Sequence, residues 1–410
     1  LTTTQKLKKL TEEKGLPKEY HNKIWRLKQQ KTLEVIDSYK IDNRIRDIIK
    51  KLKNQGYTIA CATNSIRETS KLMLIRKGFF EYIDFLYSNE DVNLPKPNAE
   101  IYMQCMIKAK VNPDETVIIE DSHIGRKGAV RSGAHLCAVI DSNDLTFSKI
   151  NNTILNAEKT SSISPKWQGG KMNVLIPMAG AGSRFEQAGY TFPKPLIDVN
   201  GKPMIQRVVE NLNIDARHIF IVQKEHYEKY SLKHTLNLIS PNCEIVQVEG
   251  VTEGAACTTL LAKKFINNNE SLVLANSDQY VQWDSNQFMY SSMADDIDAS
   301  ILTFRSTHPK WSYAKLNENG FVIEVAEKKP ISEHATVGIY FWKKGSDYVN
   351  CAEQMIEKNI RVNNEFYVCP VYNEAILDGA RVKTFHIDKM WGLGTPEDLE
   401  TFLKHDINLP

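Results

Sequence analysis

The sequence lacks several features that mark particular classes of protein. It has no run of about 18 apolar residues, the minimum for a transmembrane helix. Its first residues form neither a signal peptide nor a transit peptide. Lys and Arg number 52 against 50 Asp and Glu, so no excess of charge favours nucleic acid or a membrane surface. These absences predict a cytoplasmic protein that binds small molecules, with neither nucleic acid nor a membrane as a partner.

The cysteines also lack a pattern. The chain has seven of them, without a CxxC pair or histidine-rich spacing. Neither a zinc site nor a disulfide framework is therefore expected, and we predict reduced thiols in the core.

The length of 410 residues, with 42% hydrophobic residues, is typical of two globular domains. Apolar runs of strand length alternate with helical segments over 41–140, which predicts a parallel sheet covered on both faces. Residues 1–38 read as two or three helices, and a second alternating series begins at Val174. We predict two Rossmann-like three-layer α/β domains, over 1–140 and 171–410. The intervening 141–170, rich in Asn, Ser and Gly, is predicted to be a linker.

The first strand of the second domain runs into a loop of small residues. The loop reads Met178-Ala179-Gly180-Ala181-Gly182-Ser183-Arg184 and is followed by Pro193-Lys194-Pro195. Small residues let backbone N–H groups approach an anion, and Arg184 and Lys194 can neutralise a triphosphate from two sides. The loop is neither a Walker loop nor a GxGxxG fingerprint. It predicts a phosphate-binding site of another kind.

This loop resembles the signature of the sugar-phosphate nucleotidyltransferase family, which includes the glucose-1-phosphate thymidylyl-, uridylyl- and cytidylyltransferases. The resemblance extends from about Met172 to Leu403. Three further matches follow in the order of the family: Glu253-Gly254-Ala255-Ala256, Asn276-Ser277-Asp278 and Glu327-Lys328.

The resemblance implies a role for each matching residue. Arg184, Lys194 and Asp278 would be catalytic, with Asp278 holding Mg²⁺. Asp278 also follows an apolar strand at the carboxyl edge of the predicted sheet, where ligands of α/β proteins bind. The nucleotide would contact Ala179, Gly180, Gly182, Ser183, Glu253, Gly254 and Ala255, and the acceptor would contact Glu327, Lys328, Gly338 and Glu365.

One position departs from the family pattern. The family commonly has an aspartate two residues before a late Gly-Thr-Pro, but this chain has Gly392 there, before Gly394-Thr395-Pro396. Asp388 or a phosphate oxygen would then complete the coordination of the metal, because magnesium usually keeps waters and substrate oxygens.

The first domain carries three further motifs. Thr63-Asn64-Ser65 and Glu120-Asp121-Ser122 each follow a strand, and Lys96-Pro97 precedes a helix. A hydroxyl and an ammonium group can hold a phosphoryl group, and paired carboxylates can hold magnesium.

Together these motifs resemble motifs two to four of haloacid dehalogenase-like phosphatases, with 1–38 as part of a helical cap. The resemblance implies a phosphatase-like site at Thr63, Asn64 and Lys96, with metal at Glu120 and Asp121. The first motif of that family, Asp-x-Asp on a strand, is absent, so both nucleophile and proton donor are lacking. Either residues upstream are missing or the domain has degenerated, and we expect it to be inactive in this chain.

The predicted function is formation of an NDP-sugar and pyrophosphate from a nucleoside triphosphate and a sugar 1-phosphate. The acceptor phosphate would attack the α-phosphorus in line, so no protein nucleophile is needed. Two alternatives stay open: a cytidylyltransferase for an alcohol, polyol or other non-sugar phosphate, and a non-catalytic binder of nucleotide sugars. The base, the acceptor and homo-oligomer formation are not readable from the sequence.

Overall fold

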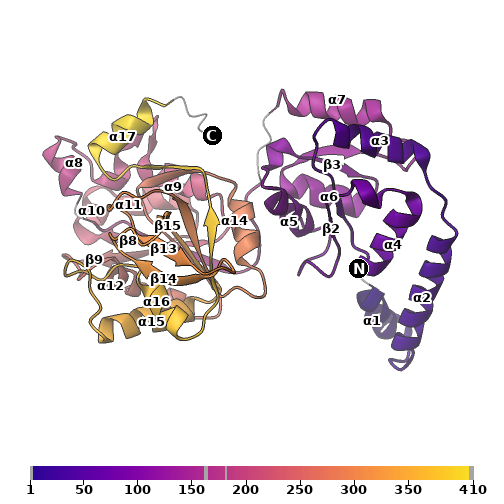
Figure 1. Cartoon of the computed structure of the whole chain (residues 1–410). Helices are drawn as coiled ribbons and strands as arrows, with labels where there is room; N and C mark the ends of the chain where they lie inside the picture. Colours follow the sequence, from indigo (N-terminus) through magenta and orange to yellow (C-terminus); the bar gives the residue numbers. More distant parts are fainter. Residues whose placement is uncertain (1–2, 161–164, 181, 406–410) are drawn as a thin grey trace. The chain divides into compact units, whose positions relative to one another are not determined.

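A computed structural model describes residues 3–160, 165–180 and 182–405 of the chain (Figure 1). The chain divides into two compact units, Leu1–Pro165 and Lys166–Pro410. Ala181, which belongs to the predicted phosphate loop, lies outside the described residues. Every helix in the described ranges is too short or too polar to span a bilayer.

The first unit begins with helices and continues with alternating strands and helices, as predicted. Two helices, α1 and α2, cover the segment predicted as a cap remnant and pack against each other. The elements of this unit are α1 (Thr3–Lys14), α2 (Tyr20–Asp37), α3 (Asn43–Asn54), β1 (Ala60–Ala62), α4 (Arg67–Lys77), β2 (Phe85–Tyr87), α5 (Glu100–Ala109), β3 (Val117–Glu120), α6 (His123–Ser132), β4 (His135–Ala138) and α7 (Phe147–Ala157).

The strands of the first unit are parallel but do not form the single sheet that we predicted. Strand β1 pairs with β2, and β3 pairs with β4, as two separate two-stranded sheets. Within the described residues, no backbone ladder joins β1 to β3.

The predicted linker at 141–170 is wrong in its first half, because α7 lies inside it. The Thr146 side chain accepts a hydrogen bond from Lys149 N and so caps the start of this helix. Ile150 is buried in a small core with Leu52, Cys137 and Val139. Composition alone did not reveal this apolar face, because α7 also contains several Asn residues.

The second unit is built on a nine-stranded mixed sheet in the order β14-β13-β15-β10-β5-β8-β9, with β12 and β16 attached through β15. Its strands are β5 (Met172–Pro177), β8 (Arg217–Gln223), β9 (Glu244–Val248), β10 (Ser271–Ala275), β12 (Ala299–Arg305), β13 (Tyr313–Leu316), β14 (Val322–Ala326), β15 (His334–Trp342) and β16 (Val382–His386).

Two small antiparallel pairs lie outside this sheet: β6 (Asp198–Val199) with β7 (Lys202–Pro203), and β11 (Gln279–Gln282) with β17 (Lys389–Gly392). The helices are α8 (Ser183–Gln187), α9 (Met204–Leu212), α10 (Lys224–Lys229), α11 (Leu232–Ile239), α12 (Ala255–Leu260), α13 (Lys263–Ile266), α14 (Ser285–Ser292), α15 (Gly345–Glu357), α16 (Val371–Leu377) and α17 (Pro396–Leu403).

Consecutive residues of the central strands enter different cores, which explains their continuous apolar runs. In β5, Leu175 belongs to a core that includes residues of α12, α15 and α16, whereas Val174 and Ile176 belong to a core that includes residues of α9, α11 and α14. Successive side chains of a strand point to opposite faces, so both faces of the sheet are covered by helices. The second unit is thus a three-layer α/β domain.

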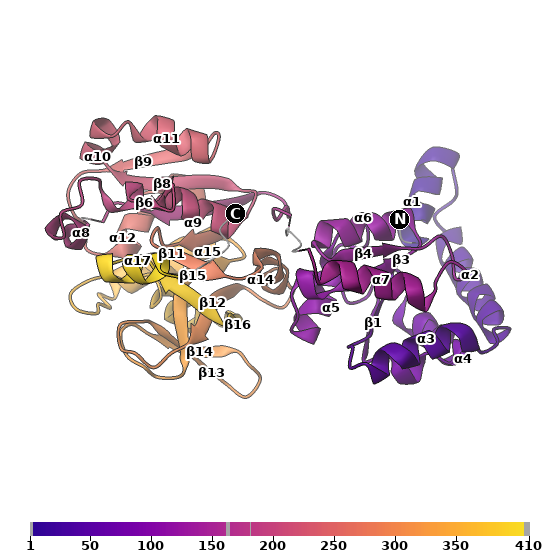
Figure 2. The same cartoon turned by 90° about the horizontal axis from the view of Figure 1, so that it is seen from above.

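The parallel strands β10, β5, β8 and β9 end at the same edge of the sheet. Figure 2 shows β9 and the β13–β14 hairpin toward opposite ends of the second unit, in agreement with the strand order. Segments that follow these strands therefore lie side by side at one edge, in an order that the sheet sets.

Candidate functional site

A cavity of about 520 Å³ lies at this carboxyl edge of the second unit. Segments far apart in the sequence line it together. Of the residues predicted for nucleotide, catalysis and acceptor, the cavity is lined by Ala179, Gly180, Gly182, Lys194, Gly254, Ala255, Asp278, Glu327, Gly338 and Glu365. The predicted Ser183, Arg184, Glu253 and Lys328 are not among its lining residues.

The predicted phosphate loop follows β5 directly. Met178 N donates to Ile221 O at 2.9 Å, which extends the pairing with β8 by one residue. Gly182 then adopts a left-handed conformation, with φ 64°, as α8 begins. A Cβ at Gly182 would lie 3.5 Å from Lys194 Cβ, so the loop passes close to the Lys194 segment. Ser183 and Arg184 are exposed.

Lys194 and Asp278 form an ion pair in the cavity. Lys194 Nζ lies 2.5 Å from Asp278 Oδ2, and about a quarter of each side chain is exposed. Leu393 N donates to Asp278 O at 2.7 Å and thereby holds the Asp278 backbone against the segment that follows β17. The ion pair joins the phosphate-loop side of the cavity to the carboxylate predicted to bind metal.

Two glycines lie beside this carboxylate. A Cβ at Gly394 would come within 2.9 Å of Asp278 Oδ2, so only glycine leaves that space open. Gly392 pairs with Gln279, and a Cβ there would lie 3.6 Å from Asp398 Oδ2. Asp388 precedes Lys389, which pairs with Gln282 at the far end of the β11–β17 ladder. The register thus places Asp388 and Asp278 at opposite ends of this ladder. The coordination of a metal by Asp388 or by a phosphate oxygen stays a prediction.

The described residues contain no group of three or more His, Cys, Asp or Glu placed to hold a metal ion. Asp278 alone cannot supply a complete set of metal ligands. Magnesium is commonly bound through one or two carboxylates together with substrate phosphates and water. The donor set at Asp278 fits that mode of binding.

Glu327 and Lys328, both predicted to contact the acceptor, have different surroundings. Ser312 Oγ donates to the Glu327 carboxylate, and burial raises the pKa of Glu327. Lys328 has a left-handed backbone, with φ 53°, and its ammonium donates to Tyr367 OH at 2.6 Å, which raises the pKa of Lys328. Glu365 and Tyr367 both line the cavity.

A tight hairpin positions Glu365. Val362 and Glu365 exchange two backbone hydrogen bonds of 3.0 Å, and the two residues between them, Asn363 and Asn364, have φ values of 49° and 63°. Positive φ at both central residues is the requirement of a type I′ turn, which Asn tolerates. The Arg361 guanidinium lies 4.0 Å from the Phe366 ring centroid and supports the hairpin from one side.

The predicted base-recognition segment packs on this hairpin. Phe366 N donates to Glu253 O and Ala256 N donates to Phe366 O, both at 2.9 Å. A Cβ at Gly254, whose φ is 130°, would lie 2.5 Å from Phe366 N and O, so glycine is required at this contact. The Glu253 carboxylate forms an ion pair with Arg361. In the structure the Glu253 side chain is therefore paired with Arg361. The predicted contact of Glu253 with a base stays a prediction.

Gly338 is also explained by close contacts. It has φ 92°, and a Cβ there would lie 2.2 Å from Asn276 Nδ2. Its carbonyl accepts a hydrogen bond from Asn276 N at 3.0 Å. The glycine thus lets β15 approach the segment that carries Asp278.

Sequence reasoning missed several residues that line the cavity, including Gln223, Trp311, Ser312 and Tyr367. Gln223 carried a usable signal, because a polar residue that ends an apolar strand lies at the ligand-binding edge of the sheet. Trp311 and Ser312 lie directly before β13, and Tyr367 lies between α15 and α16 after the Glu365 hairpin, so tertiary structure sets the position of all three.

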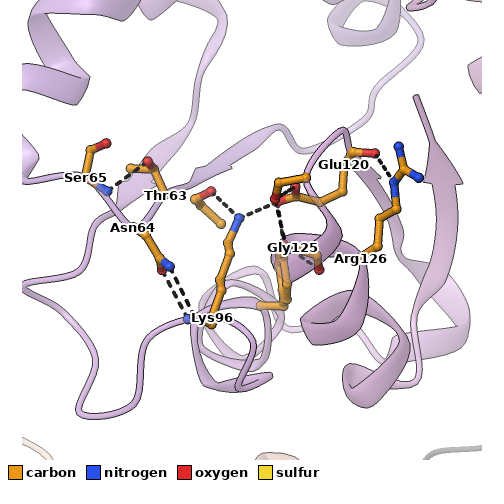
Figure 3. A network of polar contacts seen from close by, with 10 residues as sticks. Thr63, Asn64, Ser65, Lys96, Glu120, Gly125 and Arg126 are labelled. Carbon is orange, nitrogen blue, oxygen red and sulfur yellow. Dashed lines mark hydrogen bonds and ion pairs between the residues drawn. The ribbon is translucent and has the colours of Figure 1, made fainter. Parts of the chain in front are cut away.

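The first unit holds a second polar site, in which the three predicted motifs meet (Figure 3). Asn64 and Lys96 exchange two hydrogen bonds, Lys96 N to Asn64 Oδ1 at 3.1 Å and Asn64 Nδ2 to Lys96 O at 3.3 Å. The Lys96 ammonium donates to Ala62 O at 3.0 Å and forms a buried ion pair with Glu120. Thr63 Oγ1 accepts from Ser65 N at 3.1 Å.

Glu120 is the centre of this network. Burial opposes ionisation of Glu120, but hydrogen bonds from Lys96, Tyr102 and Ser122 outweigh burial and lower its pKa. A Cβ at Gly125 would lie 2.0 Å from Glu120 Oε2, so glycine makes room for the carboxylate. Asp121 is exposed, and its predicted metal role stays a prediction together with that of Glu120.

Comparison with known families agrees with both readings. The family model described as nucleotidyl transferase matches residues 173–406, more than half of the chain. The chain belongs to the nucleotidyl transferase family. The family model described as haloacid dehalogenase-like hydrolase matches residues 1–139, so this nucleotidyltransferase carries a second, hydrolase-like domain at its start.

Curated relatives match the hydrolase-like part of the nucleotidyltransferase chain. Pyrophosphatase PpaX of Bacillus cereus (strain B4264) is 24% identical over 131 residues, which is 29% of this chain and 61% of the relative. Pyrophosphatase PpaX of Bacillus anthracis (strain CDC 684 / NRRL 3495) matches with the same identity and coverage. The chain thus spans about three fifths of the length of these relatives.

Solved structures match the other part. A nucleoside-diphosphate-sugar pyrophosphorylase from Vibrio cholerae RC9 is 25% identical, with a TM-score of 0.49, over 57% of this chain and 100% of that chain. A UDP-glucose pyrophosphorylase complexed with UDP-glucose is 18% identical, with a TM-score of 0.46, over 57% of this chain and 97% of that chain. Both TM-scores are below 0.5.

Proposed function

We propose that the second unit transfers a nucleoside monophosphate from a nucleoside triphosphate to the phosphate of a sugar 1-phosphate and releases pyrophosphate. The observation that carries the proposal is the ion pair between Lys194 and Asp278 inside one cavity lined by the phosphate loop and by Glu327 and Glu365. Membership of the nucleotidyl transferase family supports the type of reaction.

The chain's own residues act by binding and charge placement. The loop after β5 offers close approach to phosphate oxygens, and Lys194 neutralises charge as pyrophosphate leaves. Arg184 and Lys328 are exposed cations outside the lining of the cavity, and we assign them to the nucleotide and the acceptor respectively. The reaction is an in-line displacement by the acceptor phosphate, so the residues need only align two substrates.

Asp278 is the residue that would hold Mg²⁺. The space beside Asp278 Oδ2, which a Cβ at Gly394 would fill, suits an ion bound by one carboxylate and by substrate oxygens. When bound, the metal supplies charge stabilisation to the triphosphate.

A sugar is proposed as the acceptor because the acceptor end combines hydrogen-bond acceptors with aromatic surface. The Glu327 and Glu365 carboxylates can accept hydrogen bonds from hydroxyl groups, and Trp311 and Tyr367 line the same cavity. A plain alkyl phosphate has no hydroxyl groups to donate to these carboxylates, and Glu327 would then keep only its donor from the protein, Ser312.

The test is a matrix of ATP, GTP, CTP, UTP and dTTP against sugar 1-phosphates, polyol phosphates and alcohol phosphates, scored by pyrophosphate release. We expect turnover with one or two triphosphates and only with sugar 1-phosphates, and turnover about a thousandfold lower in Asp278→Asn. Turnover restricted to polyol or alcohol phosphates would show that the acceptor is not a sugar phosphate. Nucleotide-sugar binding without pyrophosphate from any pair would identify a non-catalytic binder.

A further inference from the structure

Gln223 links the two loops that border one end of the cavity. It is the last residue of β8, paired with Val248 at the end of β9. Its side-chain Nε2 donates to Ala179 O at 2.7 Å and to Gly250 O at 2.9 Å. One side chain thus connects the start of the phosphate loop to the loop after β9.

These two hydrogen bonds fix the orientation of the amide. A side-chain amide has two N–H donors on nitrogen and an oxygen that only accepts, so two carbonyl partners require Nε2 on their side. No described residue donates to Gln223 Oε1, and this atom is not one of the enclosed, unpaired polar atoms. Because Gln223 lines the cavity, its oxygen is a fixed acceptor that a ligand can reach.

The wall around Gln223 is uncharged. In the lining, Gln223 contacts its hydrogen-bond partners Ala179 and Gly250 and pairs with Val248. Thr252 and Thr258, which come after β9 in the chain, line the same cavity. Lys224 follows Gln223, and Glu249 follows its strand partner Val248. These two charged side chains pair with each other at 2.7 Å and do not line the cavity.

The remaining polar groups of this wall already have partners. The Thr252 and Thr258 hydroxyls are 2.6 Å apart, and Thr252 Oγ1 lies 3.1 Å from Gly254 O. By contrast, the charged residues Lys194 and Asp278 follow the central strands β5 and β10. An uncharged base therefore suits the β8–β9 end of the cavity, and the triphosphate suits its centre.

We propose that Gln223 is a specificity-determining residue whose Oε1 accepts a hydrogen bond from an N–H on the pairing edge of the nucleobase. That donor is the ring N–H of uracil or thymine, or the exocyclic amino group of cytosine or adenine. The inference rests on the proposed function, because it assigns the base end of the same cavity.

The experiment compares the preferred triphosphate with an analogue that carries C–H in place of the donor. The analogue is the 3-deaza form of uracil or thymine, 2-pyrimidinone in place of cytosine, or unsubstituted purine in place of adenine. In the wild-type protein we expect the analogue to lower kcat/KM about tenfold, the value of one hydrogen bond. In Gln223→Met the two nucleotides should differ less than about threefold, because the acceptor is gone.

Two further variants separate base recognition from loop support. Gln223→Lys keeps a donor for the carbonyls of Ala179 and Gly250 and lacks the acceptor, so it should also lose discrimination. Gln282→Met changes an exposed glutamine at the end of β11 and should keep the wild-type ratio.

Calorimetric binding of the same two nucleotides distinguishes failure of this inference from failure of the proposed function. It reports on Gln223 even when no acceptor yields pyrophosphate. The assignment is overturned if folded Gln223→Met and Gln223→Lys keep the wild-type ratio of affinities for the parent nucleotide and the analogue. It is also overturned if the wild-type protein binds the two nucleotides with nearly equal affinity.

Discussion

The ammonium of Lys194 lies 2.5 Å from the carboxylate of Asp278, although the two residues are 84 positions apart in the chain. Lys194 comes from the segment after the phosphate loop, and Asp278 follows β10, the neighbour of β5 in the sheet. In the proposed reaction the two charges separate, with Lys194 on the triphosphate and Asp278 on magnesium.

Loss of either charge should remove activity without unfolding the protein. We expect Lys194→Met and Asp278→Asn each to lower kcat for pyrophosphate release by about a thousandfold, because both act on charge in the transition state. Circular dichroism and thermal unfolding check the fold. Lys315→Met removes a charge from an exposed position on β13 and serves as the control. Near-normal turnover of either site variant would refute the assignment.

Magnesium alone should bind weakly to the wild-type protein, because Lys194 already neutralises Asp278. The Lys194→Met variant should bind Mn²⁺, a spectroscopic substitute for Mg²⁺, at least tenfold more tightly in the absence of nucleotide, since an adjacent positive charge is gone. Electron paramagnetic resonance titration of free Mn²⁺ measures this. Equal Mn²⁺ affinities in the two proteins would show that Asp278 is not the metal ligand.

Gly254→Ala should displace one wall of the cavity. The new Cβ would lie 2.5 Å from the Phe366 backbone at φ 130°, so the base-recognition segment must move off the Glu365 hairpin. We expect a loss of stability of about 1–3 kcal/mol and a KM for nucleotide that rises more than the KM for acceptor. Gly320→Ala has φ 79° but open space around its Cβ, and so controls for backbone strain alone. Equal behaviour of the two variants would contradict the contact argument.

The first unit should bind phosphate groups without hydrolysing them. At the site of Figure 3 the Glu120 carboxylate is engaged by Lys96, and the first-strand carboxylates of the phosphatase motif are absent from the sequence. We therefore expect no turnover of p-nitrophenyl phosphate or sugar phosphates, with or without magnesium. Metal-dependent hydrolysis that disappears in Asp121→Ala would show that another residue serves as nucleophile.

His218 should make the second unit sensitive to acid. Burial, reinforced by Lys166, lowers the pKa of His218 from 6.5 to about 4, so the folded state keeps the ring neutral. As pH falls below 6.5 the unfolded chain takes up a proton that the folded chain does not, and stability is lost progressively down to about pH 4. The free energy of unfolding should fall by about 3 kcal/mol over this window. Urea titrations at several pH values should show this slope flattened in His218→Gln and unchanged in His226→Gln.

Much of the architecture could be predicted because the central strands are buried on both faces and read as continuous apolar runs. The same reasoning placed Asp278 and the phosphate loop at one edge of a sheet, where the structure has them. Strand β15 could not be placed in this way, because nothing in its apolar sequence distinguishes an antiparallel partner of β10 from a parallel one. The hydrogen bonds of Gln223 depend on the register of β8 with β9, which only tertiary structure fixes.

The order β13-β15-β10-β5-β8-β9 has a consequence for how such a protein diversifies. On the proposed reaction, base contacts belong to one end of the sheet and acceptor contacts to the other, with the reacting phosphates between them. Substitutions around Gln223 can then change the nucleotide while leaving Glu327 and Tyr367 intact, and the reverse also holds. The Gly254–Phe366 contact is where the two ends meet, so a change there alters both preferences together.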